Sequence, residues 1–222
     1  MSEISIRRSQ RFFNAFILEF YDLMLYRCIA NVFWKCKPED LVRFYRDNLS
    51  SVHMDVGVGT GYLLRHSIDD ATAVDLSLMD LNENCLNKTE KNIFPLKVKK
   101  YQRNILNEIN SISEKYTSVS INYVMHCVPG DFKEKGIAFD NLKKLLDDKG
   151  VIFGSSVISL GVRKPFHSAA LMWVFNAIGL FDNSNDSLED LRGALNRNFA
   201  FVEIIESGPT VLFRASDYAF AS

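Results

Sequence analysis

The residues with the clearest chemical potential in this chain are three alternate glycines between two acids. Gly57, Gly59 and Gly61 follow Asp55, and a second acid, Asp75, lies twenty residues after Asp55. Glycine reaches positive φ at little steric cost, so such a turn brings the backbone close to a ligand. Apolar runs before the glycines and before the second acid predict strand, turn, helix and strand, with Asp75 at the tip of the second strand. This spacing is typical of a βαβ unit that binds a nucleotide and holds its ribose with the second acid.

The first acid indicates which nucleotide is bound. A dinucleotide site opens with glycine, so that a pyrophosphate can rest on the helix N-terminus. Asp55 instead places a carboxylate there, which repels a pyrophosphate and favours an ammonium or sulfonium. The pattern Asp55-x-Gly57-x-Gly59-x-Gly61 resembles the first motif of the Rossmann-like, class I S-adenosylmethionine-dependent methyltransferases. Asp75-Leu76-Ser77 is similar to that family's ribose-binding acid, followed by the apolar residue beside the adenine. The alternative is a nucleotide-binding fold with an inactive site.

The resemblance implies a fold and a set of cofactor-binding residues. The fold is α/β, a doubly wound seven-stranded sheet of order 3-2-1-4-5-7-6 with the last strand antiparallel, helices on both faces and an N-terminal helical cap. Asn104 stands where relatives often have an acid that accepts a hydrogen bond from the adenine amino group, and an amide oxygen can also accept one. The residues predicted to bind S-adenosylmethionine are Asp55, Gly57, Gly59, Thr60, Gly61, Asp75, Leu76, Asn104, Ile105, Met125 and Tyr21. No metal ion is expected.

Hydrophobic runs and turn residues divide the chain into alternating helices and strands, as a doubly wound fold requires. The expected helices cover residues 10–30, 38–47, 60–67, 78–92, 132–146, 165–180 and 187–197. The expected strands cover residues 51–56, 71–76, 96–101, 118–125, 150–158, 199–206 and 210–216. We expect one domain, in which residues 1–48 form the helical cap and residues 49–222 the Rossmann-like core.

The end of the fourth expected strand should face the transferred methyl group, because ligands of open α/β sheets bind at the carboxyl ends of strands near the switch in strand order. Residues 122–130 read Asn-Tyr-Val-Met-His-Cys-Val-Pro-Gly. Relatives that methylate adenine N6 or glutamine carry Asn/Asp-Pro-Pro-Tyr/Phe here, so the resemblance is to small-molecule methyltransferases, many of them from secondary metabolism. His126 is a candidate general base for a hydroxyl or amine acceptor, because imidazole titrates near neutrality. Alternatively, His126 bonds to the backbone or to the amino acid portion of the cofactor.

Aromatic and apolar residues in two regions predict an enclosed acceptor pocket. Tyr21 in the N-terminal segment could cover the cofactor, although aromatic residues at helical spacing are also typical of a core. Phe166, His167, Met172 and Trp173 follow the fifth expected strand, where this fold builds its substrate wall. We therefore expect a compact acceptor rather than a polymer.

Composition limits the partners. The 222 residues carry 26 Lys and Arg against 27 Asp and Glu, so the basic footprint of a nucleic-acid-binding protein is not expected. Four scattered cysteines favour a reduced, cytoplasmic location. The N-terminus lacks the features of a signal peptide, and charges interrupt the apolar stretch 12–34, so no membrane span is expected. Composition leaves the oligomeric state open.

These observations together predict an enzyme that transfers a methyl group from S-adenosylmethionine to O, N or C of a small metabolite, in secondary metabolism. Methylation of protein or RNA is an alternative, which would need an open, groove-like or basic face. A non-catalytic partner that binds S-adenosylmethionine and regulates another enzyme is a third possibility.

Overall fold

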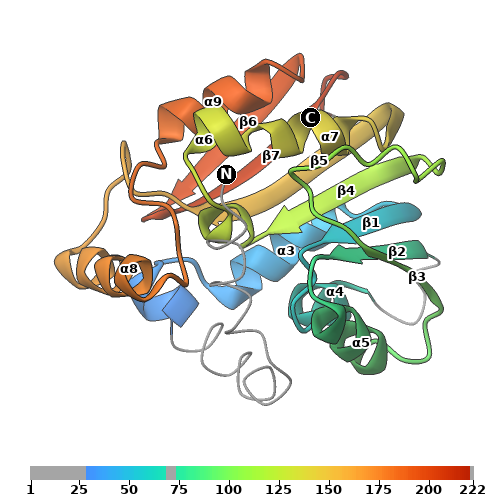
Figure 1. Cartoon of the computed structure of the whole chain (residues 1–222), viewed down its shortest axis with the longest axis horizontal. Helices are drawn as coiled ribbons and strands as arrows, with labels where there is room; N and C mark the ends of the chain where they lie inside the picture. The colour runs from blue at the N-terminus through green and yellow to red at the C-terminus, as the bar shows by residue number, and fades with distance from the viewer. Residues whose placement is uncertain (1–28, 69–73, 221–222) are drawn as a thin grey trace.

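A seven-stranded sheet organises the part of the chain that the computed structural model describes, residues 29–68 and 74–220 (Figure 1). The strands are β1 (Val52–Val56), β2 (Asp75–Asp80), β3 (Val98–Gln102), β4 (Tyr116–Asn122), β5 (Leu146–Val157), β6 (Phe201–Ser207) and β7 (Thr210–Ser216). Their order is β3-β2-β1-β4-β5-β7-β6, with β1 to β5 parallel and β7 antiparallel to both of its neighbours. The predicted fold class and strand order are confirmed.

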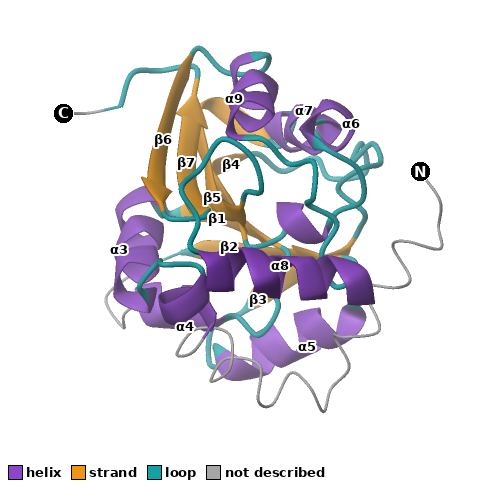
Figure 2. Cartoon of the chain, turned by 90° about the vertical axis from the view of Figure 1, so that its left-hand side faces the viewer, coloured by secondary structure: helices purple, strands orange, loops and turns teal. Residues whose placement is uncertain are grey.

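Two layers of helices cover the sheet (Figures 1 and 2). They are α3 (Pro38–Asn48), α4 (Tyr62–Ser67), α5 (Glu83–Asn92), α6 (Phe132–Lys135), α7 (Ile137–Lys143), α8 (Phe166–Ile178) and α9 (Leu188–Asn196), with a short 3₁₀ turn, η2 (Met125–Cys127). On one face α6, α7 and α9 bury Phe132, Phe139 and Leu195 in a core with the strands. On the other face α3, α4, α5 and α8 form a second core that includes Leu64 and Met172. None of the helices in the described residues is long and apolar enough to cross a membrane.

The second strand differs most from the sequence pattern. We expected a strand over residues 71–76 that ends at Asp75, but β2 begins at Asp75 and ends at Asp80. Residues 76–79 are all buried, because helices cover both faces of the sheet here. A strand buried on both faces has no polar alternation to mark its ends. The prediction that Asp75 lies at the carboxyl tip is therefore wrong.

Helix boundaries also shifted where capping or glycine intervenes. Asn82 caps α5 by accepting a hydrogen bond from the Asn84 amide, so this helix starts later than expected. The single helix expected over 132–146 is two short helices that meet at Gly136. Of the expected N-terminal cap, residues 1–28 with Tyr21 lie outside the described residues. The second helix of that cap, α3, packs against the sheet and buries Tyr45 there.

Candidate active site

The glycine turn lies between β1 and α4, at the carboxyl edge of the sheet and beside the point where the strand order reverses. Gly57, Gly59 and Gly61 have φ angles of 69°, 55° and 74°, a region that favours glycine. Helix α5 holds the turn in place, since Asn92 Nδ2 donates to the carbonyl of Thr60 at 2.8 Å. The predicted turn therefore lies where open α/β sheets bind ligands.

The three glycines serve two different purposes. A Cβ on Gly57 would lie 2.1 Å from Cγ2 of Val124, and one on Gly61 would lie 2.7 Å from Cγ2 of Thr89. These two positions need glycine because neighbouring side chains pack directly on the backbone. A Cβ on Gly59 would meet nothing within 4 Å. The backbone at Gly59 is thus free to approach a ligand, which is what a bound S-adenosylmethionine requires.

Asp80, which the sequence pattern did not single out, is the acid next to this turn. It ends β2, and its carboxylate accepts hydrogen bonds from the amides of Asn82, at 2.8 Å, and Gly59. Burial raises the pKa of Asp80 to about 6, against the effect of these amides. Asp75 lies at the opposite edge of the sheet, where its side chain is 61% exposed and 3.9 Å from Lys99 Nζ. A signal for Asp80 was present, since this acid stands two residues before the cap of the next helix.

Of the residues predicted to surround the adenine, one lies away from the carboxyl edge of the sheet and two lie at it. Leu76 is buried in the core near the start of β2, remote from the carboxyl edge, so its predicted place beside an adenine is wrong. Asn104 and Ile105 follow β3 at the carboxyl edge, and the amide of Arg103 donates to the Asp80 carbonyl at 3.1 Å. The Asn104 side-chain oxygen accepts from the Leu106 amide at 3.0 Å, which orders this turn. Its role as an adenine-binding residue stays a prediction.

Asp55 is buried beside the glycine turn without a cationic partner among the described residues. Ser120 of β4 donates to its Oδ1 at 2.5 Å. Burial raises the pKa of Asp55 to about 7, Ser120 opposes this shift, and the nearby charge of Asp80 adds to it. A buried acid of this kind gains from a positively charged ligand, in agreement with the charge predicted for the cofactor.

The chain leaves β4 through a turn that shapes the other side of the site. Tyr123 has a φ of 54°, a backbone conformation that residues other than glycine adopt rarely and that often occurs at functional sites. This turn directs Val124 against Gly57 and leads into η2. Met125, predicted to bind the cofactor, is fully buried in the core on the side of α6, α7 and α9.

His126 in η2 is a buried, neutral imidazole. Its Nδ1 accepts a hydrogen bond from the Val157 amide at 3.3 Å, which leaves the ring proton on Nε2, and its ring centroid lies 4.3 Å from that of Phe181. Burial, followed by the charge of Lys135, lowers the pKa of His126 to about 3. The expectation that this imidazole titrates near neutrality is wrong. The geometry agrees with the alternative, a histidine that bonds to the backbone.

A buried ion pair fixes the segment that covers His126. Lys135 Nζ donates to Asp186 Oδ2 at 2.7 Å, and also to the carbonyls of Val128 at 3.2 Å and Asp182 at 3.1 Å. Both charged side chains are fully buried. The Asp182 amide in turn donates to the His126 carbonyl at 2.8 Å. The segments after η2 and after α8 are therefore held together as one rigid wall.

Helix α8 contributes less to this wall than its composition predicted. Met172 is buried, and its sulfur accepts a hydrogen bond from Ser159. Phe166 and Trp173 are 89% and 72% exposed and point away from the core. His167 is also exposed, with Nε2 3.2 Å from the carbonyl oxygen of Val32.

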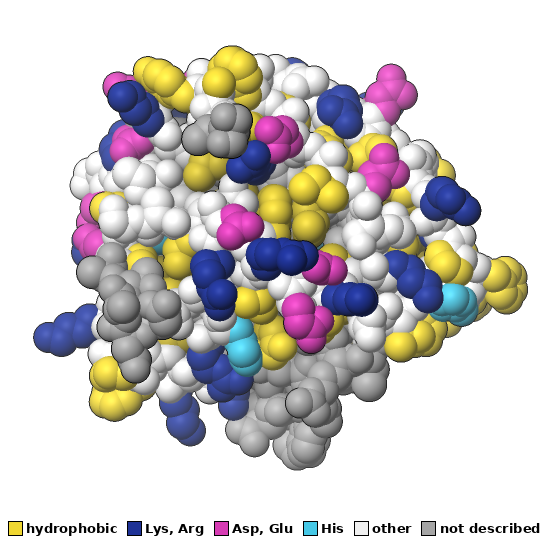
Figure 3. All heavy atoms as spheres, turned by 180° about the vertical axis from the view of Figure 1, so that it is seen from behind, with side chains coloured by type: hydrophobic (Ala, Val, Ile, Leu, Met, Phe, Trp, Pro, Cys, Tyr) yellow, Lys and Arg dark blue, Asp and Glu magenta, His cyan; other side chains and the backbone are white. Residues whose placement is uncertain are grey.

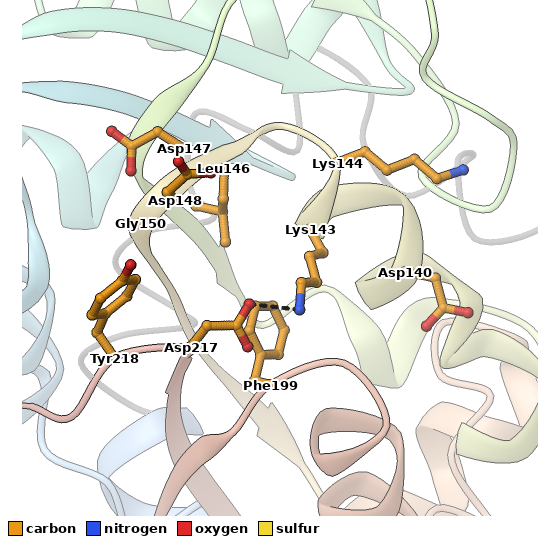
Figure 4. Close-up of a pocket in the computed structure, with 10 residues that line it drawn as sticks. All are labelled: Asp140, Lys143, Lys144, Leu146, Asp147, Asp148, Gly150, Phe199, Asp217 and Tyr218. Carbon is orange, nitrogen blue, oxygen red and sulfur yellow. Dashed lines mark ion pairs between the residues drawn. The ribbon is translucent and has the colours of Figure 1, made fainter.

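A separate hollow of about 560 Å³ lies near the start of β5 and the end of β7 (Figure 4). It is lined by Asp140, Lys143, Lys144, Leu146, Asp147, Asp148, Gly150, Phe199, Asp217 and Tyr218. Because the carboxyl end of β4 lies at the other edge of the sheet, this hollow is remote from the glycine turn. Within it, Lys143 Nζ lies 2.7 Å from Asp217 Oδ2.

Comparison with known proteins shows which family the chain resembles. A methyltransferase of Calcarisporium arbuscula named aurB is 36% identical over 220 residues, which cover 93% of this chain and 96% of the relative. Demethylluteothin O-methyltransferase of Streptomyces thioluteus is 33% identical over 198 residues, which cover 89% of this chain and 86% of the relative.

Solved structures share the fold at lower identity. The complex of DhpI with S-adenosylhomocysteine superposes with a TM-score of 0.67 at 13% identity, over 96% of this chain and 97% of that one. The chain matches no protein-family model. Because it is similar to named methyltransferases across most of its length and folds as they do, the chain belongs to the class I, Rossmann-like S-adenosylmethionine-dependent methyltransferases of the small-molecule type.

Proposed function

We propose that this enzyme methylates O, N or C of a compact, largely apolar metabolite of secondary metabolism, and that the glycine turn, Asp80 and Asp55 hold S-adenosylmethionine. The observation that carries the proposal is the open space at Gly59, whose amide also bonds to Asp80. When bound, S-adenosylmethionine supplies a methyl group already activated on a sulfonium. The chain's own residues then have to orient the acceptor and exclude water.

The cofactor-binding roles belong to this proposal. Asp80 replaces Asp75 as the acid that accepts hydrogen bonds from the ribose hydroxyls. Asn122, the last residue of β4, supports a ligand at this edge, since its buried Nδ2 has no hydrogen-bond partner among the described residues. Asn104 and the N-terminal segment with Tyr21 complete the proposed enclosure.

The acceptor side of the proposal rests on apolar neighbours of η2. Phe181 and Tyr123 are buried against His126, and Trp34 packs on Phe181, so this part of the wall offers aromatic rings. Several relatives are named as O-methyltransferases, and one from Penicillium aethiopicum is named as an N-methyltransferase. These names support oxygen or nitrogen as the acceptor atom.

Protein and RNA are less favoured as substrates. On the face shown in Figure 3, lysine and arginine side chains lie among aspartate and glutamate rather than in a continuous basic patch. The proposal therefore includes a small-molecule partner, no nucleic acid and a cytoplasmic location.

The deciding experiment incubates the purified protein with methyl-labelled S-adenosylmethionine and extract of its own cells, and sorts the label by product size. We expect label in the small-molecule fraction. Label in protein or RNA would replace the acceptor assignment, and binding without transfer would favour the non-catalytic alternative. Gly59→Ala is the matched control, because its Cβ would extend into the space that the ligand needs, and this variant should transfer no label.

A further inference from the structure

The side-chain hydroxyl groups around Asp55 can bond to both its neutral and its charged form. Ser120 Oγ lies 2.5 Å from its Oδ1 and 3.2 Å from His53 Nε2, and Tyr45 Oη lies 2.8 Å from the same imidazole nitrogen. Hydroxyl groups rotate and both donate and accept hydrogen bonds. Ser120 can therefore donate to a carboxylate or accept from a carboxylic acid without any movement of heavy atoms.

The groups that face Asp55 do not fix its charge. Tyr45 faces it from α3, His53 from β1, Asp80 from β2 and Ser120 from β4, and the Val56 amide is its one fixed donor among the described residues. Burial lowers the pKa of His53 to about 3, so this imidazole stays neutral and provides no positive charge. A carboxylate buried among hydroxyls and beside a second carboxyl group is costly without a cation.

The ligands before and after methyl transfer differ in charge. The donor carries a positive sulfonium, and the product S-adenosylhomocysteine is a neutral thioether with the same ribose, adenine and amino acid groups. Asp55 lies in β1, two residues before Gly57, the first glycine of the turn that forms the proposed cofactor site. Its hydroxyl partners can change from donating to accepting a hydrogen bond.

We propose, building on the proposed function, that Asp55 distinguishes donor from product through one proton: the free enzyme and the product complex hold it as the neutral acid, and the donor complex holds it as the carboxylate. Binding of the donor then releases one proton from the Asp55 carboxyl group to the solvent. Transfer of the methyl group breaks its bond to sulfur and removes the positive charge, and the acceptor loses to the solvent the proton that the methyl group replaces. The Asp55 carboxylate then takes up a proton from the solvent, and the product is bound less tightly.

The test is calorimetric titration of the full chain with S-adenosylmethionine and with S-adenosylhomocysteine at about pH 6, in buffers of different ionisation enthalpy, because the buffer dependence of the heat counts protons. We expect the donor to release nearly one proton more than the product. Donor affinity should also fall by up to about tenfold for each pH unit below about pH 7, beyond any change in product affinity. Asp55→Asn should abolish both differences and shows how much the amino groups of the ligands contribute.

Two further variants keep the result interpretable. Asp80→Asn should move the pH dependence of donor affinity to lower pH, because the nearby charge of Asp80 adds to the pKa of Asp55. Ser120→Ala removes a donor to the carboxylate, so the pH dependence of donor affinity should move to higher pH, and this variant tests the proposal even where Asp55→Asn does not fold. Equal proton counts for donor and product in the wild-type enzyme would overturn the inference alone. Failure of both ligands to bind would instead overturn the proposed function.

Discussion

Replacing Asp80 and Asp75 separately by asparagine tests the main correction to the sequence-based site. If Asp80 accepts hydrogen bonds from the ribose, Asp80→Asn removes a charged acceptor, and bonds to charged groups are worth about 1.5–3 kcal/mol. The dissociation constant of S-adenosylmethionine should therefore rise by about tenfold to a hundredfold. Asp75→Asn should leave it unchanged, because Asp75 is exposed at the opposite edge of the sheet.

The stability of the free enzyme gives an independent measure of the same side chain. Burial raises the pKa of Asp80 from 3.8 to about 6. The folded state therefore holds the Asp80 proton more tightly than the unfolded state, and this contribution to stability is complete below about pH 4 and lost as the pH rises through about 6. The free energy of unfolding of the wild type, relative to Asp80→Asn, should fall by about 2.4 kcal/mol from pH 4 to pH 7, at about 1.4 kcal/mol per pKa unit.

Calorimetry of ligand binding and urea unfolding at several pH values measure the two effects. Normal cofactor affinity in a folded Asp80→Asn variant, together with weak binding in Asp75→Asn, would refute the placement of the ribose at the carboxyl end of β2. A pH-independent stability difference would show that Asp80 is not held in the buried environment described above.

Three more predictions follow from the site. Gly59→Ala should fold, with a loss of about 1–2 kcal/mol from its positive φ, but should lose the melting shift caused by S-adenosylmethionine. Gly57→Ala should fold poorly, because its Cβ would clash with Val124. Thermal scans separate the two variants, and a normal ligand shift in Gly59→Ala would contradict the placement of the cofactor on this turn. His126→Asn should raise KM or lower stability and keep the shape of the pH–rate profile, because the pKa of His126 is lowered to about 3. A wild-type rate that falls below about pH 6.5, together with a variant rate that does not, would instead support His126 as the general base. Lys135→Met should destabilise the fold by about 3–5 kcal/mol by leaving Asp186 unpaired, and Lys135→Met with Asp186→Leu should recover much of this in urea unfolding, a result that a merely local packing defect would not give.

Local patterns predicted the features that depend on neighbours in the sequence. The glycine spacing at 57, 59 and 61 predicted a tight turn with positive φ, which depends only on the local backbone, and all three residues have positive φ. The expected strands 199–206 and 210–216 and the expected helix 187–197 likewise depend on short segments, and β6, β7 and α9 occupy these ranges. Strand order came from resemblance to a family, since pairing between distant strands leaves little trace in one sequence.

Long-range contacts explain what the sequence could not reveal. The pKa of His126 is lowered because segments from later in the chain, which include Phe181, bury it, and because they bring the charge of Lys135 near it. Asp80 was missed because a strand buried on both faces has no polar alternation to show at which of its two acids it ends. The spacing of twenty residues favoured the wrong one, since the connection between α4 and β2 is longer than that spacing assumes.

The chemistry of the site follows from these long-range contacts. Because burial lowers the pKa of His126 and its Nδ1 is taken up by the Val157 amide, we infer that η2 contributes to methyl transfer through position rather than by withdrawing a proton. The buried pair of Lys135 and Asp186 ties together the segments around it. Methyl transfer to an activated sulfonium can gain most of its rate from such fixed orientation. We therefore expect the enzyme to turn over acceptors that lose their proton readily, such as phenols and enols, faster than aliphatic alcohols. Equal turnover of the two classes, measured side by side, would show that orientation alone is not sufficient.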